Sequence, residues 1–171
     1  TPPSAAHSDV MRPPMDLPPA STWRPRASLP ARANAARTVA SSSIALLKGV
    51  GFNRVSLGIQ DFDPIVQEAI TRIQPFSDIA ALVDRIRDHG FRSLSFDLIY
   101  GLPYQNRASM DDTLKKVIAL HPDRIACYNY AHLPERFPSQ RAIDRLSLPS
   151  PEEKLVLHQQ IATTLMDAGY R

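Results

Sequence analysis

The chain shows a regular pattern of hydrophobic and polar positions only from about residue 41 onward. Apolar side chains alternate with polar or small ones in three short segments, which predicts the β-strands RVSLGIQ, RSLSFDLIYG and RIACYNYAHL. Elsewhere apolar residues recur every three or four positions, which predicts amphipathic helices. The segment SDIAALVDRIRDHG follows this helical period most closely, at Ile79, Leu82, Val83 and Ile86.

Capping residues mark where the helices are expected to begin. Asp63 and Pro64 predict the start of a helix through IVQEAITRI, because proline is tolerated at the first helical position. Serine side chains are expected to cap the three longer helices, and these serines are Ser77, Ser109 and Ser150. Short helices are predicted for SSSIALLKG before the first strand and for SQRAIDRL before the last helix.

Strands and helices alternate at intervals of about 35 residues, which argues for parallel βα units joined by right-handed crossovers. We therefore expect residues 41–171 to form an α/β structure, a partial (β/α) barrel of about three parallel units. Ligands of such folds bind beyond the carboxyl ends of the strands. The polar residues expected there include Gln60, Asp61, Asp97 and Asn129. Three parallel strands alone would leave two open edges and one uncovered face.

Residues 1–40 differ in composition from the rest of the chain. They hold eight of the sixteen prolines, five arginines and only two acids, Asp9 and Asp16, so they carry the whole formal excess of +3. Proline removes backbone donors, and the segment has too little apolar area to offset its ordering entropy. We expect a disordered Pro/Arg/Ala/Ser-rich segment here.

Three explanations compete for this segment. It could be a flexible tail, or it could be an organelle transit peptide, since it is rich in arginine, alanine and serine. Its prolines oppose the amphipathic helix that transit peptides form. The third explanation is an artefact of out-of-frame or mis-joined translation, because GC-rich DNA in a wrong frame gives the same bias.

Composition excludes several classes of function for the remainder. Residues 41–171 balance fifteen basic against fifteen acidic side chains, so the basic pI indicates no nucleic-acid-binding face. No apolar run is long enough to span a membrane, and no secretory signal is evident. The single cysteine, Cys127, excludes a disulfide framework and a cysteine-only metal cluster held by this sequence alone. We expect a cytoplasmic protein.

Several polar residues have both a structural and a functional interpretation. Asp97 could pair with a neighbouring arginine, and Arg72 could complement a helix dipole near a helix C-terminus. Gly101 could mark only a turn. His132 is the one histidine at a strand end, where it could act as acid or base or simply donate to a carbonyl. Cys127 is more typical of a small buried residue than of a cluster ligand.

Four consecutive segments resemble motifs of one enzyme family, and they are GFNRVSLGIQDFD, DLIYGLPYQ, DRIACYNYAHLPERFPSQR and LPSPEEK. Their order and intervals are similar to those of oxygen-independent coproporphyrinogen III oxidase (dehydrogenase), of the radical S-adenosylmethionine superfamily. The resemblance runs from about Ile44 to Arg171. Related haem chaperones usually have Q-S-F where this chain has Gln60-Asp61-Phe62, so the oxidase is favoured over a haem-chaperone-like relative.

This resemblance implies a fold, cofactors and a reaction. Family members bind S-adenosylmethionine in a partial (β/α)6 barrel, the radical SAM core, and hold a [4Fe–4S] cluster on a C-x-x-x-C-x-x-C loop. The reduced cluster cleaves S-adenosylmethionine to a 5′-deoxyadenosyl radical, which takes hydrogen from a propionate of the tetrapyrrole substrate. The propionate then loses carbon dioxide and becomes a vinyl group. Coproporphyrinogen III is thereby converted to protoporphyrinogen IX in haem biosynthesis.

The resemblance also implies four cofactor-binding residues. Gln60 matches a polar residue that contacts the adenosyl ligand, and Arg72 matches a cation of the same site, suited to the methionine carboxylate. Asp97 matches an acid at a strand end, and Ala131 matches a position that touches the ligand through backbone or apolar contact. The sequence identifies no catalytic residue and no metal ligand.

The sequence departs from the family by lacking the C-x-x-x-C-x-x-C motif and the family's C-terminal domain. We therefore expect a central fragment of the enzyme that is inactive alone. Two alternatives stay open. The chain could be a cluster-less module that binds S-adenosylmethionine or a tetrapyrrole, or it could assemble with a separately encoded, cluster-bearing half.

Overall fold

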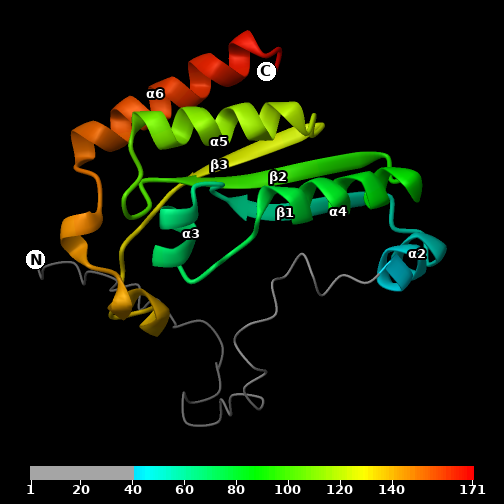
Figure 1. Ribbon diagram of the computed structural model, residues 1–171, viewed down its shortest axis with the longest axis horizontal. Helices are drawn as coiled ribbons and strands as arrows, with labels where there is room; N and C mark the ends of the chain where they lie inside the picture. The colour runs from blue at the N-terminus through cyan, green and yellow to red at the C-terminus, as the bar shows by residue number, and fades with distance from the viewer. Residues whose placement is uncertain (1–40) are drawn as a thin grey trace, which may run out of the picture. The chain divides into compact units, whose positions relative to one another are not determined.

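A computed structural model describes residues 41–171, which form a three-stranded parallel sheet with its helices (Figure 1). In chain order the elements are α2 (Ser41–Gly49), β1 (Arg54–Gln60), α3 (Pro64–Ala69), α4 (Phe76–Asp88), β2 (Ser93–Tyr100), α5 (Arg107–Ala119), β3 (Arg124–Asn129), the 3-10 helices η2 (Pro138–Ala142) and η3 (Arg145–Ser147), and α6 (Pro151–Asp167). The expectations for residues 1–40 lie outside the described residues.

The sheet has the predicted parallel order, β1-β2-β3. Gly58 pairs with Asp97, and Asp97 pairs with Ala126 on the third strand. The register shifts between Gly58 and Gln60, so β1 carries one extra residue at its carboxyl end. Such a bulge bends a strand locally and re-aims the side chains beside it.

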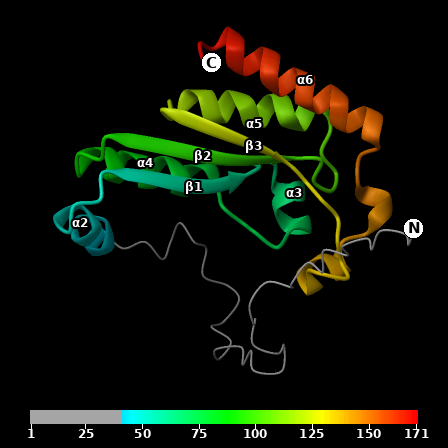
Figure 2. The same cartoon turned by 180° about the vertical axis from the view of Figure 1, so that it is seen from behind.

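The helices cover one face of the sheet. In Figure 1 α4 and α5 lie in front of the strands, and from behind, in Figure 2, the strands lie in front of these two helices. The apolar positions of the strands pack against them in a single core, whose largest buried side chains include Phe96, Ile59, Leu98, Met110 and Leu114. Burial of such side chains stabilises the fold by about 1.5–3 kcal/mol each.

The opposite face of the sheet carries small and polar side chains. The alternation of the strands turns Ser56, Gly58, Ser95 and Asp97 away from the core, and none of these four is buried. Tyr128, on the same face of β3, is 56% exposed. Among the described residues no helix covers this face (Figure 2), as expected for a part of a barrel whose interior it would line.

Three helix starts and ends differ from the predictions. Helix α4 begins at Phe76 after Pro75, so Ser77 lies in its first turn instead of capping it. Asn106 caps α5, and Ser109 completes a capping box three residues later. Helix α3 ends at Ala69 because Thr71 adopts a left-handed φ of 56°.

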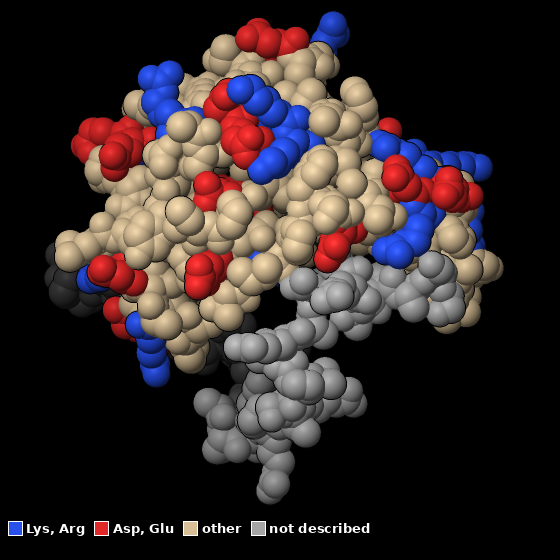
Figure 3. Space-filling view, viewed as in Figure 1, with Lys and Arg blue, Asp and Glu red and all other residues tan. Residues whose placement is uncertain are grey.

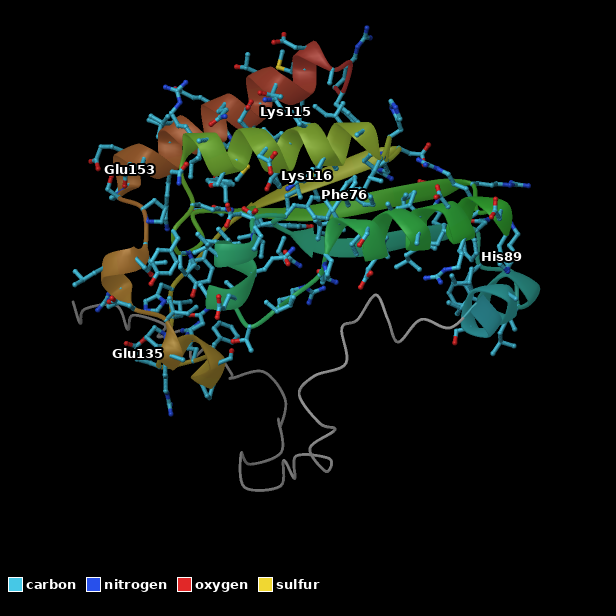
Figure 4. All side chains as sticks on the ribbon, in the orientation of Figure 1. Phe76, His89, Lys115, Lys116, Glu135 and Glu153 are labelled. Atoms are coloured by element: carbon cyan, nitrogen blue, oxygen red, sulfur yellow. The ribbon has the colours of Figure 1, made fainter. Side chains whose placement is uncertain are left out.

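The C-terminal helix was predicted correctly. Ser150 caps α6, and Glu153 returns a hydrogen bond to its backbone N–H, with Pro151 in the first turn. Figure 4 shows Glu153 at this end of α6. The predicted short helix before it is instead two 3-10 turns, η2 and η3.

The surface over the helices carries charges of both signs. Lys115 and Lys116 on α5, labelled in Figure 4, pair with Asp111 and Asp112 one turn earlier. Figure 3 shows basic and acidic groups side by side on this face. None of the helices in residues 41–171 has the length and apolar character needed to cross a membrane.

Candidate functional site

The carboxyl end of β1 is turned sharply at Gln60. The N–H of Asp61 donates to the carbonyl of Ile59 at 2.8 Å, and Gln60 between them has a φ of 66°. A hydrogen bond between residues two apart around a positive φ defines the strained form of the γ-turn. A residue other than glycine that is held at such a positive φ lowers the stability by on the order of 1–3 kcal/mol, and backbone strain of this kind is concentrated at ligand-binding sites.

This turn places the Gln60 amide over Gly58. A Cβ added at Gly58 would lie 2.7 Å from Nε2 of Gln60 and 3.1 Å from Nη2 of Arg72. Position 58 therefore has room for the two side chains because it carries none of its own. Gly58 thus lets the ends of the Gln60 and Arg72 side chains lie together on the uncovered face of the sheet, an arrangement here called the cradle.

Arg72 reaches the same cradle from the loop between α3 and α4. Its Nη2 donates to the carbonyl of Gly58 at 2.8 Å, and its Nε donates to Oε1 of Gln74 at 3.0 Å. No hydrogen bond within the described residues uses Nη1, so this end of the guanidinium can still donate. The helix-dipole interpretation of Arg72 is not what the structure shows, since α3 ends at Ala69 and Arg72 bonds to the strand instead.

Asp97 lies directly beside the cradle, paired with Gly58 in the sheet. Its Oδ2 accepts a hydrogen bond of 3.0 Å from the hydroxyl of Ser56, two residues before Gly58 on β1. The salt bridges of the described residues do not include Asp97, so the neutral Ser56 is its partner rather than an arginine. Asp97 also borders a hollow of about 500 Å³ on the open face, with Ser95, Arg124 and Tyr128 around it.

Ala131 lies in the exposed loop that follows β3. The side chain of Gln140 clamps this loop, since Nε2 donates to the carbonyl of Ala131 at 3.1 Å and Oε1 accepts from the N–H of Leu133. Between them His132 has its Nδ1 3.2 Å from the hydroxyl of Tyr130, and the two rings are tilted against each other. His132 is thus held by Tyr130, and burial raises the pKa of that tyrosine.

The structure therefore brings two of the four expected ligand residues together, since the side chains of Gln60 and Arg72 meet at Gly58. Asp97 is the sheet partner of Gly58, with its carboxylate bonded to Ser56, and Ala131 lies beyond the end of the third strand, with no hydrogen bond to the other three within residues 41–171. The N–H of Tyr130 donates to the carbonyl of Tyr100 at 2.8 Å, which keeps this loop at the same end of the sheet.

Sequence reasoning placed Asp61 at a strand end but missed its burial, and it missed the buried glutamines around it altogether. Asp61 is fully buried, and Gln67, Gln74 and Gln105 are 4–6% exposed. Oxygens of the Asp61 carboxylate accept from the N–H of Asp63, the hydroxyl of Thr113 and Nε2 of Gln105. Burial raises the pKa of Asp61, although these hydrogen bonds oppose the shift. The only available signal was that an acid follows the strand directly.

Gly101 forms a turn and also leaves space for the side chain of Lys154. It adopts a φ of 83°, and a Cβ there would lie 2.7 Å from Cε of Lys154. The Lys154 stem thus crosses the end of β2, and its Nζ donates to the carbonyl of Tyr130 at 3.1 Å. The GLP motif and the LPSPEEK motif are therefore in contact in the folded chain.

The described residues do not fit an iron–sulfur cluster. No group of three or more His, Cys, Asp or Glu side chains is placed to hold a metal in residues 41–171. Cys127 packs against the hydrophobic core, and burial raises its pKa to about 11. Such a thiol is a poor metal ligand, so its interpretation as a packed residue agrees with the structure.

Comparison with known proteins gives one family. Residues 33–117 match the model of the radical SAM superfamily. Oxygen-independent coproporphyrinogen III oxidase of Pseudomonas aeruginosa is 50% identical over 130 residues, which are 76% of this chain and 28% of that protein. The same enzyme of Escherichia coli is 46% identical over 125 residues, 73% of this chain and 27% of that protein.

A solved structure agrees with this assignment. The structure of coproporphyrinogen III oxidase from Escherichia coli, described as a radical SAM enzyme, superposes with a TM-score of 0.77 at 43% identity. The match covers 80% of this chain and 31% of that protein. The chain thus spans less than a third of the length of these relatives.

Proposed function

The chain belongs to the radical SAM superfamily, and on this basis we propose that it forms an S-adenosylmethionine-binding part of an oxygen-independent coproporphyrinogen III oxidase. The observation that carries the proposal is the meeting of the Gln60 amide and the Arg72 guanidinium over Gly58. The likeness to oxidases at 43–50% identity supports the same function.

The residues of the cradle fit the chemistry of S-adenosylmethionine. The free Nη1 end of Arg72 is a fixed cation suited to the methionine carboxylate. The Gln60 amide offers both a donor and an acceptor to polar atoms of the ligand. Asp97 supplies acceptor oxygens one strand away, while Ala131 would add backbone or apolar contact.

When bound, S-adenosylmethionine supplies radical chemistry, the abstraction of a hydrogen atom from a carbon of the substrate. We propose that the complete enzyme uses it to convert propionates of coproporphyrinogen III to vinyl groups with loss of carbon dioxide. The part played by this chain is to bind and orient the ligand on the open face of its sheet.

No step is derived through the [4Fe–4S] cluster, because the described residues do not fit it and the whole sequence holds one cysteine. We propose that cluster ligands come from other polypeptide, and that the uncovered face of β1, β2 and β3 completes a barrel with it. We further propose a cytoplasmic location, where a free cysteine such as Cys127 stays reduced.

Calorimetric titration of the 171-residue chain with S-adenosylmethionine tests the binding proposal. We expect saturable binding that weakens about tenfold or more in Arg72→Gln, since a charge-assisted hydrogen bond is lost. Arg92→Gln is the matched control, because Arg92 is exposed at the opposite end of the sheet. Absence of binding by the unmodified chain would overturn the proposal.

A second assay separates an enzyme part from a binding module. The chain is mixed with a cluster-bearing polypeptide, S-adenosylmethionine, reductant and coproporphyrinogen III without oxygen, and vinyl product and carbon dioxide are measured. Product that requires both components supports the enzyme part. Binding of S-adenosylmethionine without any product in the mixture would instead support a cluster-less binding module.

A further inference from the structure

A network of buried side chains lies behind the cradle, and it is made by Asp61, Gln67 and Gln74. These three residues, here called the buried polar network, are no more than 4% exposed. They come from the end of β1, from α3 and from the loop before α4. None of them lies on the open face, so they act on a ligand only through other residues.

Asp61 is the last residue of the γ-turn at Gln60, and its side chain is held by several hydrogen bonds. Its carboxylate accepts from the N–H of Asp63 at the start of α3 and from the hydroxyl of Thr113 on α5. The amide of Gln105, which also donates to the carbonyl of Ile99, adds a third hydrogen bond from the loop after β2. Three elements thus hold Asp61, and with it the turn at Gln60.

Gln67 connects Asp61 to the loop that carries Arg72. Its Nε2 donates to the carbonyl of Asp61 at 2.8 Å and to the carbonyl of Gln74 at 2.9 Å. Its Oε1 accepts from the N–H of Gln74 at 2.9 Å. The whole amide is therefore used, and all three bonds are to backbone groups.

The side chain of Gln74 in turn holds Arg72 by a hydrogen bond. Its Oε1 accepts from Nε of Arg72 at 3.0 Å, and Arg72 in turn donates to the carbonyl of Gly58 at 2.8 Å. The connections form a closed circuit that leaves β1 at Asp61 and returns to it at Gly58. Two of the four non-glycine residues with a positive φ among the described residues, Gln60 and Thr71, lie directly beside this circuit, whose hydrogen bonds offset the cost of their backbone strain.

We propose that Gln67 is a positioning residue for Arg72, and that it sets the direction of this guanidinium toward S-adenosylmethionine. The inference rests on the proposed function for the identity of the ligand. An apolar residue would pack α3 against the sheet equally well, yet it would leave buried groups of Asp61 and Gln74 unpaired. The loop would then relax, and the Arg72 guanidinium would lose its fixed direction.

Two ligands that share the adenosyl and methyl groups test this role. S-adenosylmethionine has the carboxylate expected at Arg72, whereas methylthioadenosine lacks the whole aminocarboxypropyl group that carries it and has an uncharged sulfur. In Gln67→Met, which keeps length and removes the amide, we expect affinity for S-adenosylmethionine to fall about tenfold or more. Affinity for methylthioadenosine should change by less than about threefold, because only the contact through Arg72 is displaced. Gln159→Met, an exposed change on α6, is the matched control.

A readout that needs no ligand accompanies the titrations. The side-chain Nε–H of Arg72 donates to Gln74, so its NMR signal should exchange slowly with water in the unmodified chain. In Gln67→Met the signal should broaden or exchange rapidly, while that of the control stays unchanged.

The outcomes separate this inference from the proposed function. An equal loss of affinity for both ligands in Gln67→Met, or an unchanged Arg72 signal in that variant, would overturn the positioning role. If the unmodified chain binds no S-adenosylmethionine, the proposed function fails, and the Arg72 signal alone decides whether Gln67 positions this side chain.

Discussion

The hydroxyl of Thr113 donates a 2.7 Å hydrogen bond to Oδ1 of Asp61, which joins the middle of α5 to the end of β1 across 52 positions of sequence. The same hydroxyl oxygen accepts the N–H of Phe62 at 3.2 Å. Asp61 and Thr113 are both almost fully excluded from water, at 0% and 1% exposure. A helix that covers the sheet thus also fixes the turn from which Gln60 projects.

Replacing Thr113 with valine keeps its shape and removes this hydroxyl. The change leaves the Phe62 N–H and one Asp61 oxygen without that partner, so the free energy of unfolding should fall by about 1–3 kcal/mol. Urea denaturation measures the difference. Thr163→Val, at an exposed position of α6, should lie within about 0.5 kcal/mol of the unmodified chain. An equal effect of both substitutions would contradict the buried role of Thr113.

Asp61 should make the stability depend on pH. Burial raises its pKa in the folded chain above the ordinary value of 3.8, so the folded state binds the proton more tightly than the unfolded state. The stability that comes from this difference is fully present below pH 3.8 and is lost as the pH rises through the folded pKa.

The comparison with Asp61→Asn isolates this contribution. Relative to that variant, the unmodified chain should lose stability with rising pH over this window, by at most about 1.4 kcal/mol per pH unit. Urea denaturation at a series of pH values measures it, with Asp84→Asn on the exposed side of α4 as control. A difference that does not vary with pH would show that the Asp61 pKa is not raised.

Gly58→Ala should separate ligand binding from stability. The new methyl group would meet Nε2 of Gln60 and Nη2 of Arg72, which are the ends of long side chains and can move away. We therefore expect unfolding free energy to change by less than about 1 kcal/mol, since alanine also suits a strand better than glycine. Affinity for S-adenosylmethionine should fall about tenfold, because the methyl group displaces the Gln60 amide and the Arg72 guanidinium from their places over Gly58.

Thermal denaturation and calorimetric titration of Gly58→Ala measure the two quantities. Gly49→Ala, where no atom lies within 4 Å of the added Cβ, should leave affinity unchanged. Full affinity in Gly58→Ala would show that the ligand does not use this cradle.

Gln140 should control the order of the loop that contains Ala131. Its amide holds the carbonyl of Ala131 and the N–H of Leu133, so Gln140→Ala removes both bonds. Hydrogen exchange at the Leu133 N–H should become about tenfold faster or more, as expected for loss of a bond worth roughly 1 kcal/mol or more. Gln159→Ala should leave this exchange rate unchanged. Slow exchange of the Leu133 N–H in Gln140→Ala would contradict the role of Gln140 in holding the loop.

Cys127 should react slowly with iodoacetamide. Burial raises its pKa to about 11, so at pH 8 roughly one molecule in a thousand carries the reactive thiolate. In urea the pKa returns to its ordinary value of 9.0, and the rate should increase about a hundredfold. Mass spectrometry of the alkylated chain gives both rates. Equal rates in the two solutions would indicate an accessible, activated thiol.

Much of the fold was predicted from local sequence patterns. The alternation in RVSLGIQ and the helical period at Ile79, Leu82, Val83 and Ile86 depend on side chains within one element, and β1 and α4 formed where expected. Ser150 was identified as a cap from its place directly before Pro151 and the helical segment, and the structure confirms it. The family motifs named Gln60 and Arg72, whose side chains meet at Gly58, and Asp97, which pairs with Gly58 in the sheet; the role of these residues in ligand binding stays a prediction.

Other features were decided by the tertiary structure alone. The left-handed φ of Gln60 could not be predicted, because residue 60 is not a glycine. The groups that offset its strain lie on α3 and α5, and they reach the turn only in the folded chain. Gln67 looked like an ordinary helix residue, since its partners Asp61 and Gln74 approach it only once α3 packs on the sheet. Periodicity determines which face of an element is buried, whereas hydrogen bonds between elements depend on where the folded chain places their ends.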